Sequence, residues 1–124
     1  MTDDTTDPTV CQMAGFTSVI GGRWKLGILC TLTTSGKARF NELVERLDPI
    51  TPTTLTRQLR ELERDGLVNR TQYNEIPPRV EYAATEMSAT LGPVLATIAE
   101  WVQTHAPQRS TMTETARNEI GQPV

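Results

Sequence analysis

The segment Thr51–Leu67 constrains the fold most, because it contains the start, the apolar face and the end of one helix. Thr51 is a suitable N-cap, and Pro52 follows at the first helical position, where a missing N–H costs little. Gly66 favours an ending, since glycine adopts the left-handed conformation cheaply. Three leucines at i, i+4 and i+7 form one apolar face: Leu55, Leu59 and Leu62. The pattern predicts a short amphipathic helix.

The outer face of this helix is polar and basic. Its candidate contact residues are Thr53, Thr54, Thr56, Arg57 and Arg60. Short hydroxyl side chains near the N-terminal end, followed by arginines, suit a helix that enters a DNA major groove. An ordinary surface helix, with its arginines paired to Glu61 or Glu63, fits the same pattern and remains an alternative.

The surrounding sequence predicts a winged helix-turn-helix, a mainly α fold with a small β-hairpin. Helices are expected over 10–20, 24–32 and 40–47, with a short strand over 37–39. After Gly66, alternating residues predict strands over 67–73 and 79–83, separated by a turn with two prolines. Helix, turn, helix and hairpin in this order form the winged motif. A helix over 86–105 follows, and Pro93 either bends it or marks a break.

The 124 residues suggest one domain. We expect residues 1–9 to form a disordered arm, 10–105 the domain and 106–124 a disordered tail. No apolar run is long enough to span a membrane, and the acidic N-terminus is unlike a signal peptide, so we expect a cytoplasmic protein.

The net charge of −3 conceals a basic middle segment. Residues 23–79 hold ten basic and seven acidic side chains, whereas both flanking segments are net acidic. Local charge, rather than total charge, governs contact with phosphates.

Four motifs resemble the HxlR-type transcriptional regulators of bacteria and archaea. In order they are Ile20-Gly21-Gly22-Arg23-Trp24, Arg39-Phe40-Asn41-Glu42-Leu43, Leu59-Arg60-Glu61-Leu62-Glu63 with Gly66-Leu67-Val68, and Pro77-Pro78-Arg79-Val80-Glu81-Tyr82. The resemblance implies a winged helix-turn-helix, a homodimer formed through the terminal helices, and binding to palindromic double-stranded operator DNA. Repression is the commoner outcome in the family. A winged-helix module that binds protein instead of DNA is the alternative.

The resemblance also supplies candidate interface residues. Those expected in the dimer seam are Phe16, Val19, Leu95, Ile98, Trp101 and Val102. Those expected to contact the DNA backbone or minor groove beside the central helix are Lys37, Arg39, Arg70 and Arg79. For Arg79, a cross-strand pair with Glu75 or Glu81 is an equally simple interpretation.

Cys11 matches the position of an N-terminal cysteine that senses oxidants or electrophiles in several family members. A helix N-terminus can lower a thiol pKa, but Gln12 replaces the proline usual in the family, and a small residue at the interface is the alternative. A small-molecule effector bound in the dimer seam is an alternative signal to oxidation of Cys11. Cys30 is expected to be half-buried. With one histidine and no metal-ligand spacing, the sequence predicts no enzyme, metal or cofactor.

Overall fold

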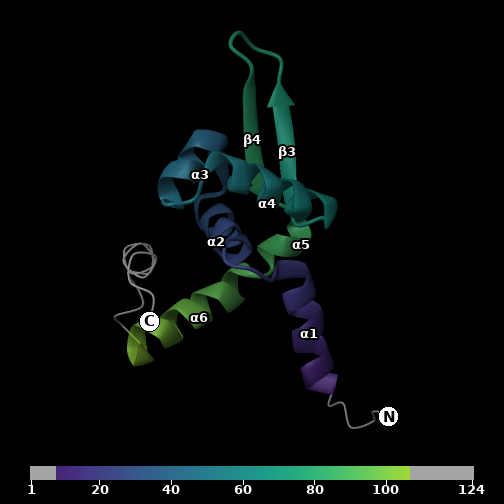
Figure 1. Ribbon diagram of the computed structural model, residues 1–124, viewed down its shortest axis with the longest axis vertical. Coiled ribbons are helices and arrows are strands. Elements are labelled where there is room, and N and C mark those ends of the chain that lie inside the picture. Colours follow the sequence, from purple (N-terminus) through teal and green to yellow (C-terminus); the bar gives the residue numbers. More distant parts are fainter. Residues whose placement is uncertain (1–7, 107–124) are drawn as a thin grey trace.

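The computed structural model describes residues 8–106 and contains a winged helix-turn-helix. The elements are α1 (Pro8–Ile20), α2 (Lys25–Ser35), β2 (Lys37–Arg39), α3 (Phe40–Arg46), α4 (Pro52–Arg64), β3 (Val68–Tyr73), β4 (Arg79–Ala84), α5 (Glu86–Ala89) and α6 (Gly92–His105). Figure 1 shows the hairpin of β3 and β4 projecting from one end of the molecule, and α1 and α6 diverging at the other. Helices α2, α3 and α4 form the body between them.

The sheet has the strand order β2-β4-β3 and is antiparallel throughout. Tyr82 on β4 pairs with Ala38 on β2 and Arg70 on β3, so these three residues share one face. That face is turned toward the helices, because Ala38 is buried and Tyr82 packs against the core. Glu81 and Arg79 therefore lie on the opposite face of the sheet.

The core is built around α2. Ile28, Leu29 and Leu32 on this helix are essentially inaccessible to solvent. The leucines of α4 complete the same cluster, with exposed fractions of 0–2%: Leu55, Leu59 and Leu62. Burying a leucine side chain contributes roughly 1.5–3 kcal/mol, so this face fixes α4 firmly and leaves its other face in solvent.

The ends of α4 agree with the predicted signals. Thr51 Oγ1 accepts a hydrogen bond from the Thr54 backbone N–H at 3.2 Å, and Pro52 occupies the first turn. Gly66 has a φ of +79°, the left-handed conformation that favours glycine. The Leu67 N–H then donates to the Leu62 carbonyl at 2.9 Å, which ends the helix and directs the chain into β3.

Two boundaries differ from expectation. Helix α1 begins at Pro8, so the last two residues of the expected arm are helical. Residues 1–7 and 107–124, and with them the rest of the expected arm and tail, lie outside the described residues.

The expected C-terminal helix is broken into α5 and α6, as one interpretation of Pro93 anticipated. Pro93 stands in the first turn of α6, where its missing N–H has no partner to lose. Within residues 8–106, none of the helices combines the length and the hydropathy needed to cross a membrane.

Candidate nucleic-acid interface

The outer face of α4 presents two exposed arginines, Arg57 and Arg60. Neither has an ion pair or side-chain hydrogen bond among residues 8–106. The alternative of intrahelical pairing is therefore not adopted. Glu61, which the sequence offered as an ion-pair partner for these arginines, instead receives a hydrogen bond from Lys25 Nζ on α2 at 2.7 Å. Both guanidinium groups are left with all their donors available.

The Lys25–Glu61 pair joins α2 to α4 and was not anticipated. The hydrogen bond and positive charge of Lys25 hold the pKa of Glu61 below its usual range, against a smaller opposing effect of burial. The charges of Arg64 and Arg57 act in the same direction as Lys25, but less strongly. Glu61 is thus an ionised carboxylate whose main partner comes from the core side of the helix.

The three candidate threonines of α4 have different surroundings. Thr53 is exposed. Thr54 takes part in the cap, since Thr51 Oγ1 donates to its hydroxyl at 3.0 Å. Thr56 is half-buried, and its hydroxyl donates to the Pro52 carbonyl at 2.9 Å. Thr53 therefore has the hydroxyl best placed to meet a partner outside the chain.

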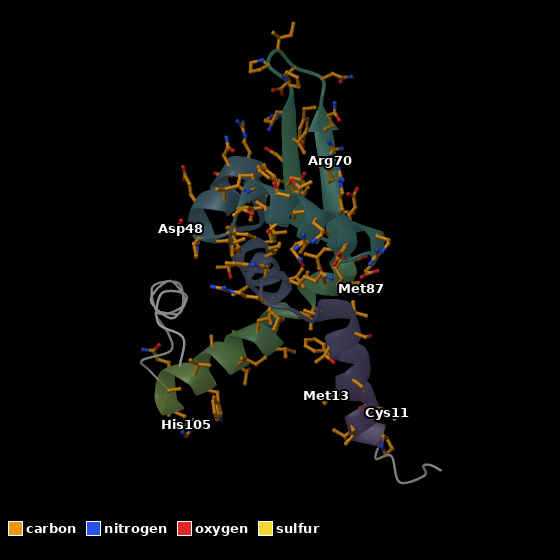
Figure 2. All side chains as sticks on the ribbon, viewed as in Figure 1. Cys11, Met13, Asp48, Arg70, Met87 and His105 are labelled. Atoms are coloured by element: carbon orange, nitrogen blue, oxygen red, sulfur yellow. The ribbon has the colours of Figure 1, made fainter. Side chains whose placement is uncertain are left out.

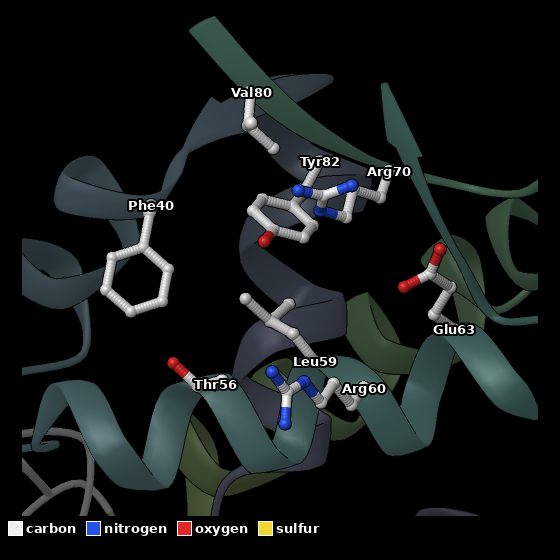
Figure 3. Close-up of a pocket in the computed structure, with 8 residues that line it drawn as sticks. All are labelled: Phe40, Thr56, Leu59, Arg60, Glu63, Arg70, Val80 and Tyr82. Atoms are coloured by element: carbon white, nitrogen blue, oxygen red, sulfur yellow. The ribbon is translucent and has the colours of Figure 1, made fainter. Parts of the chain in front are cut away.

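A cleft of about 510 Å³ separates α4 from the hairpin, and we call it the wing cleft. It is lined by Phe40, Thr56, Leu59, Arg60, Glu63, Arg70, Val80 and Tyr82. Figure 3 shows Arg60 on α4 along one side, Arg70 and Tyr82 from the strands opposite, and Phe40 at the side of the cleft. Helix α4 and the hairpin thus contribute one arginine each to the wing cleft, Arg60 and Arg70.

Arg79 is engaged within the hairpin. Its Nη2 donates to Glu75 Oε2 at 2.8 Å, and its Nη1 to Glu81 Oε2 at 2.6 Å. The guanidinium also lies 3.9 Å from the centre of the Tyr73 ring. Hydrogen bonding to Arg79 lowers the pKa of Glu75, and the pair raises the pKa of Arg79. The glutamate-pair alternative therefore describes Arg79, but neither pair is cross-strand, because Glu75 lies in the turn and Glu81 on the same strand β4.

Lys37 and Arg39 lie on the same face of the sheet as this cluster. Lys37 Nζ is 4.0 Å from Glu81 Oε1, and its side chain is mostly exposed. Arg39 lies opposite Glu81 in the strand pairing, and its charge contributes to the lowered pKa of Glu75. Both cations are on the surface but face away from the wing cleft.

Exposed apolar side chains gather on the two terminal helices. The large ones on α1 and α6 are Val10, Met13, Val19, Val94, Ile98 and Trp101, with exposed fractions from 37% to 60%. Phe16 and Val102 are half-buried, while Leu95, at 7%, belongs to the core and offers little surface. Figure 2 shows Met13 and Cys11 on α1 at the end of the molecule remote from Arg70 and the hairpin.

Both cysteines are free and exposed. This agrees with an accessible thiol at Cys11. The expectation that Cys30 would be half-buried is wrong, because α2 turns this position away from the core that its neighbours Ile28 and Leu29 enter.

A family model described as HxlR-like helix-turn-helix matches residues 19–110. The chain belongs to the HxlR family. A protein from Methanothermobacter thermautotrophicus described as an HTH-type transcriptional regulator is 43% identical over 110 residues, which covers 89% of this chain and 83% of the relative. The chain is therefore a transcriptional regulator with a helix-turn-helix domain.

Solved structures support the same assignment. The redox regulator HypR in its oxidised form is 42% identical, with a TM-score of 0.72, and the match covers 77% of this chain and 97% of HypR. The reduced form of the transcriptional regulator YodB from Bacillus subtilis is 29% identical, with a TM-score of 0.64, over 82% of this chain and 95% of YodB. This member of the HxlR family thus shares its winged fold with regulators whose redox state has been examined.

Proposed function

We propose that this HxlR-family protein is a homodimer that binds a palindromic DNA operator and represses transcription. The observation that carries the proposal is the outer face of α4, where Arg57 and Arg60 are exposed and unpaired within residues 8–106. A buried apolar face holds this helix, while Thr53, Arg57, Arg60 and Arg64 on its other side are exposed. Such a helix can enter a major groove without rearrangement of the fold.

Positions on α4 determine which bases each side chain can reach. Thr53, Arg57 and Arg60 are spaced i, i+4 and i+7, and they line one shallow groove on the helix surface. Arginine can donate two hydrogen bonds to guanine O6 and N7, and a threonine methyl group can contact the methyl group of thymine. We assign Arg57 to base recognition, because it lies in the N-terminal half of the helix.

The wing cleft suits the DNA backbone that borders the groove. Arg60 and Arg70 bring a cation to each side of it, and a phosphate between them would receive charge-assisted hydrogen bonds. Arg79 is not available for such a contact unless its bonds to Glu75 and Glu81 break. We therefore assign the backbone contact of the hairpin to Arg70, and Lys37 and Arg39 to accessory contacts.

The dimer is proposed to form through α1 and α6. Helix α1 packs on the body only near its C-terminal end, where Ile20 is buried and Phe16 touches the core. The remaining apolar side chains of α1 and α6 lie uncovered at one end of the molecule, as Figure 1 shows for the helices themselves. A second copy with the same uncovered faces is the simplest partner, because a two-fold interface joins identical patches. Two α4 helices would then meet successive major grooves roughly 34–36 Å apart.

Cys11 is exposed on α1 within this proposed seam. HypR is described as a redox regulator, and we propose that Cys11 of this chain responds to oxidants or electrophiles. With diamide, two Cys11 thiols would lose two protons and two electrons to the reagent and form one disulfide between protomers. A small effector bound in the seam would act on the same subunit angle.

The test is binding to the protein's own upstream intergenic DNA, measured by fluorescence anisotropy over a range of salt concentrations, with the oligomeric state measured by light scattering. We expect a dimer whose affinity falls steeply with salt, because each phosphate contact contributes a slope of about −0.9 on a double-logarithmic plot. Salt-insensitive association with a protein, and no DNA binding, would support the protein-binding alternative instead.

A further inference from the structure

Lys25 stands at the start of α2, on the core side of α4. Its exposed fraction is 7%, and it is the only charged residue that is buried among residues 8–106. A buried ammonium group needs a partner, because removing it from water without one is costly. Its partner is the Glu61 carboxylate at 2.7 Å, whose side chain is one-third exposed. The lysine lies inside, and the carboxylate reaches the surface.

That carboxylate emerges among the cations of the proposed DNA surface. Glu61 lines the same surface groove as Arg57 and Arg64. On a helix, side chains three and four positions apart are neighbours, so Arg57 at i−4 and Arg64 at i+3 both flank Glu61. Arg64 is already hydrogen-bonded to Asp65 at 3.4 Å, but Arg57 has no such partner among the described residues. Glu61 is therefore the nearest potential competitor for Arg57.

We propose that Lys25 is a positioning residue that occupies Glu61 and thereby leaves Arg57 free to bind DNA. The proposal rests on the proposed function, because it assumes that the α4 surface meets DNA. Lys25 donates to Glu61 at 2.7 Å, and its effect in lowering the pKa of Glu61 exceeds that of the charges of Arg64 and Arg57. Without Lys25, Glu61 would turn its charge outward, pair with Arg57 and repel the DNA phosphates.

A purely structural role for the Lys25–Glu61 pair, in which it only holds α2 against α4, predicts a different effect of substitutions on DNA binding. If the pair only supported the position of α4, loss of either partner would weaken DNA binding in the same direction. If Lys25 prevents competition, the two losses act in opposite directions. Lys25→Met releases the competitor, whereas Glu61→Gln removes it. The double variant Lys25→Met/Glu61→Gln keeps the net charge of the native chain and contains neither group.

The experiment measures binding of full-length variants to the upstream intergenic DNA and to random-sequence duplex DNA, at several salt concentrations. We expect Lys25→Met to bind the upstream intergenic DNA at least about tenfold more weakly, because an arginine–base contact is impaired in each protomer, and to lose much less affinity for random-sequence DNA. Glu61→Gln should bind as tightly as the native protein or more tightly. The double variant should recover native affinity. Arg23→Met, which removes an exposed cation outside α4 and the hairpin, is the matched control and should change affinity less than Lys25→Met.

Arg57 provides an independent readout through a double-mutant cycle on the upstream intergenic DNA at low salt. In an Arg57→Ala background, Lys25→Met should lose most of its effect, because the arginine that Glu61 would capture is already absent. Equal weakening by Lys25→Met and Glu61→Gln, or a double variant that folds but does not recover, would overturn the proposal. Glu61→Gln keeps it testable even if Lys25→Met does not fold. Absence of DNA binding by the native protein would instead refute the proposed function.

Discussion

Replacing Arg57 with alanine tests the proposed interface at its central residue. The side chain is exposed and makes no ion pair or hydrogen bond within residues 8–106. Its removal should therefore leave the free energy of unfolding within about 0.5 kcal/mol of the native value. Any large effect on DNA binding would then come from the interface and not from the fold.

The expected size follows from one lost contact in each protomer. A bidentate arginine–guanine contact is worth about 1–3 kcal/mol, and a symmetric dimer loses two of them. The combined loss of about 2–6 kcal/mol corresponds to an operator affinity roughly 30-fold to 20,000-fold weaker. Affinity for random-sequence DNA should fall much less, because base contacts contribute little there.

The assay is fluorescence anisotropy with labelled operator and labelled random-sequence duplex, accompanied by thermal unfolding and light scattering. Arg23→Ala is the matched control, since it also removes an exposed arginine but lies outside α4, β2 and the hairpin. An Arg57→Ala dimer that binds the operator within threefold of the native protein (on the order of 0.6 kcal/mol) would refute the assignment of Arg57 to base recognition.

Three further predictions concern the seam, the hairpin and the Lys25–Glu61 pair. Ile98→Asp should raise the dimer dissociation constant at least about tenfold, because a charge would be buried in the seam. The control Gln103→Asp, which lies on another face of α6, should leave the dimer intact, and light scattering measures both variants. Arg70→Ala should reduce the salt slope by about one per protomer, while Arg79→Ala should mainly increase hydrogen exchange in the hairpin; the opposite pattern would reverse their roles. The lowered pKa of Glu61 means that its ionised form stabilises the fold at neutral pH, and that this stabilisation is lost as the pH falls through the lowered pKa. Acid unfolding of Glu61→Gln, followed by circular dichroism, should lack that component.

Local signals made α4 and the hairpin predictable. The cap at Thr51, the buried leucines and the positive φ of Gly66 are all properties of a short stretch of chain. The break before α6 could only be offered as one of two alternatives, because a proline either bends a helix or begins a new one. The exposure of Cys30 was missed, since α2 is apolar enough around its circumference to hide which side faces the core.

Contacts between residues that are distant in the sequence could not be predicted from local patterns. Lys25 and Glu61 belong to different helices, and nothing in the spacing of either helix connects them. The signal available was a single lysine at the start of an apolar helix, a position where a charge needs a partner. For Arg79, the residue pattern was compatible with both a DNA contact and a local pair, and only the geometry showed that Glu75 and Glu81 hold the side chain. Likewise, Arg57 is free of an ion pair among residues 8–106 because Glu61 is paired with Lys25 on another helix.

Helix α2 lies between the two surfaces on which the proposed function depends. It contacts α6 at one side, where Gly92 approaches Thr33, and α4 at the other, through Lys25 and Glu61. Because Ile28 and Leu29 are fully buried, α2 has no room to move independently of its neighbours. A change of angle at the seam would therefore carry α6, α2 and α4 together as one rigid body. Oxidation or an effector would then act by changing the separation of the two α4 helices, while each protomer keeps its fold.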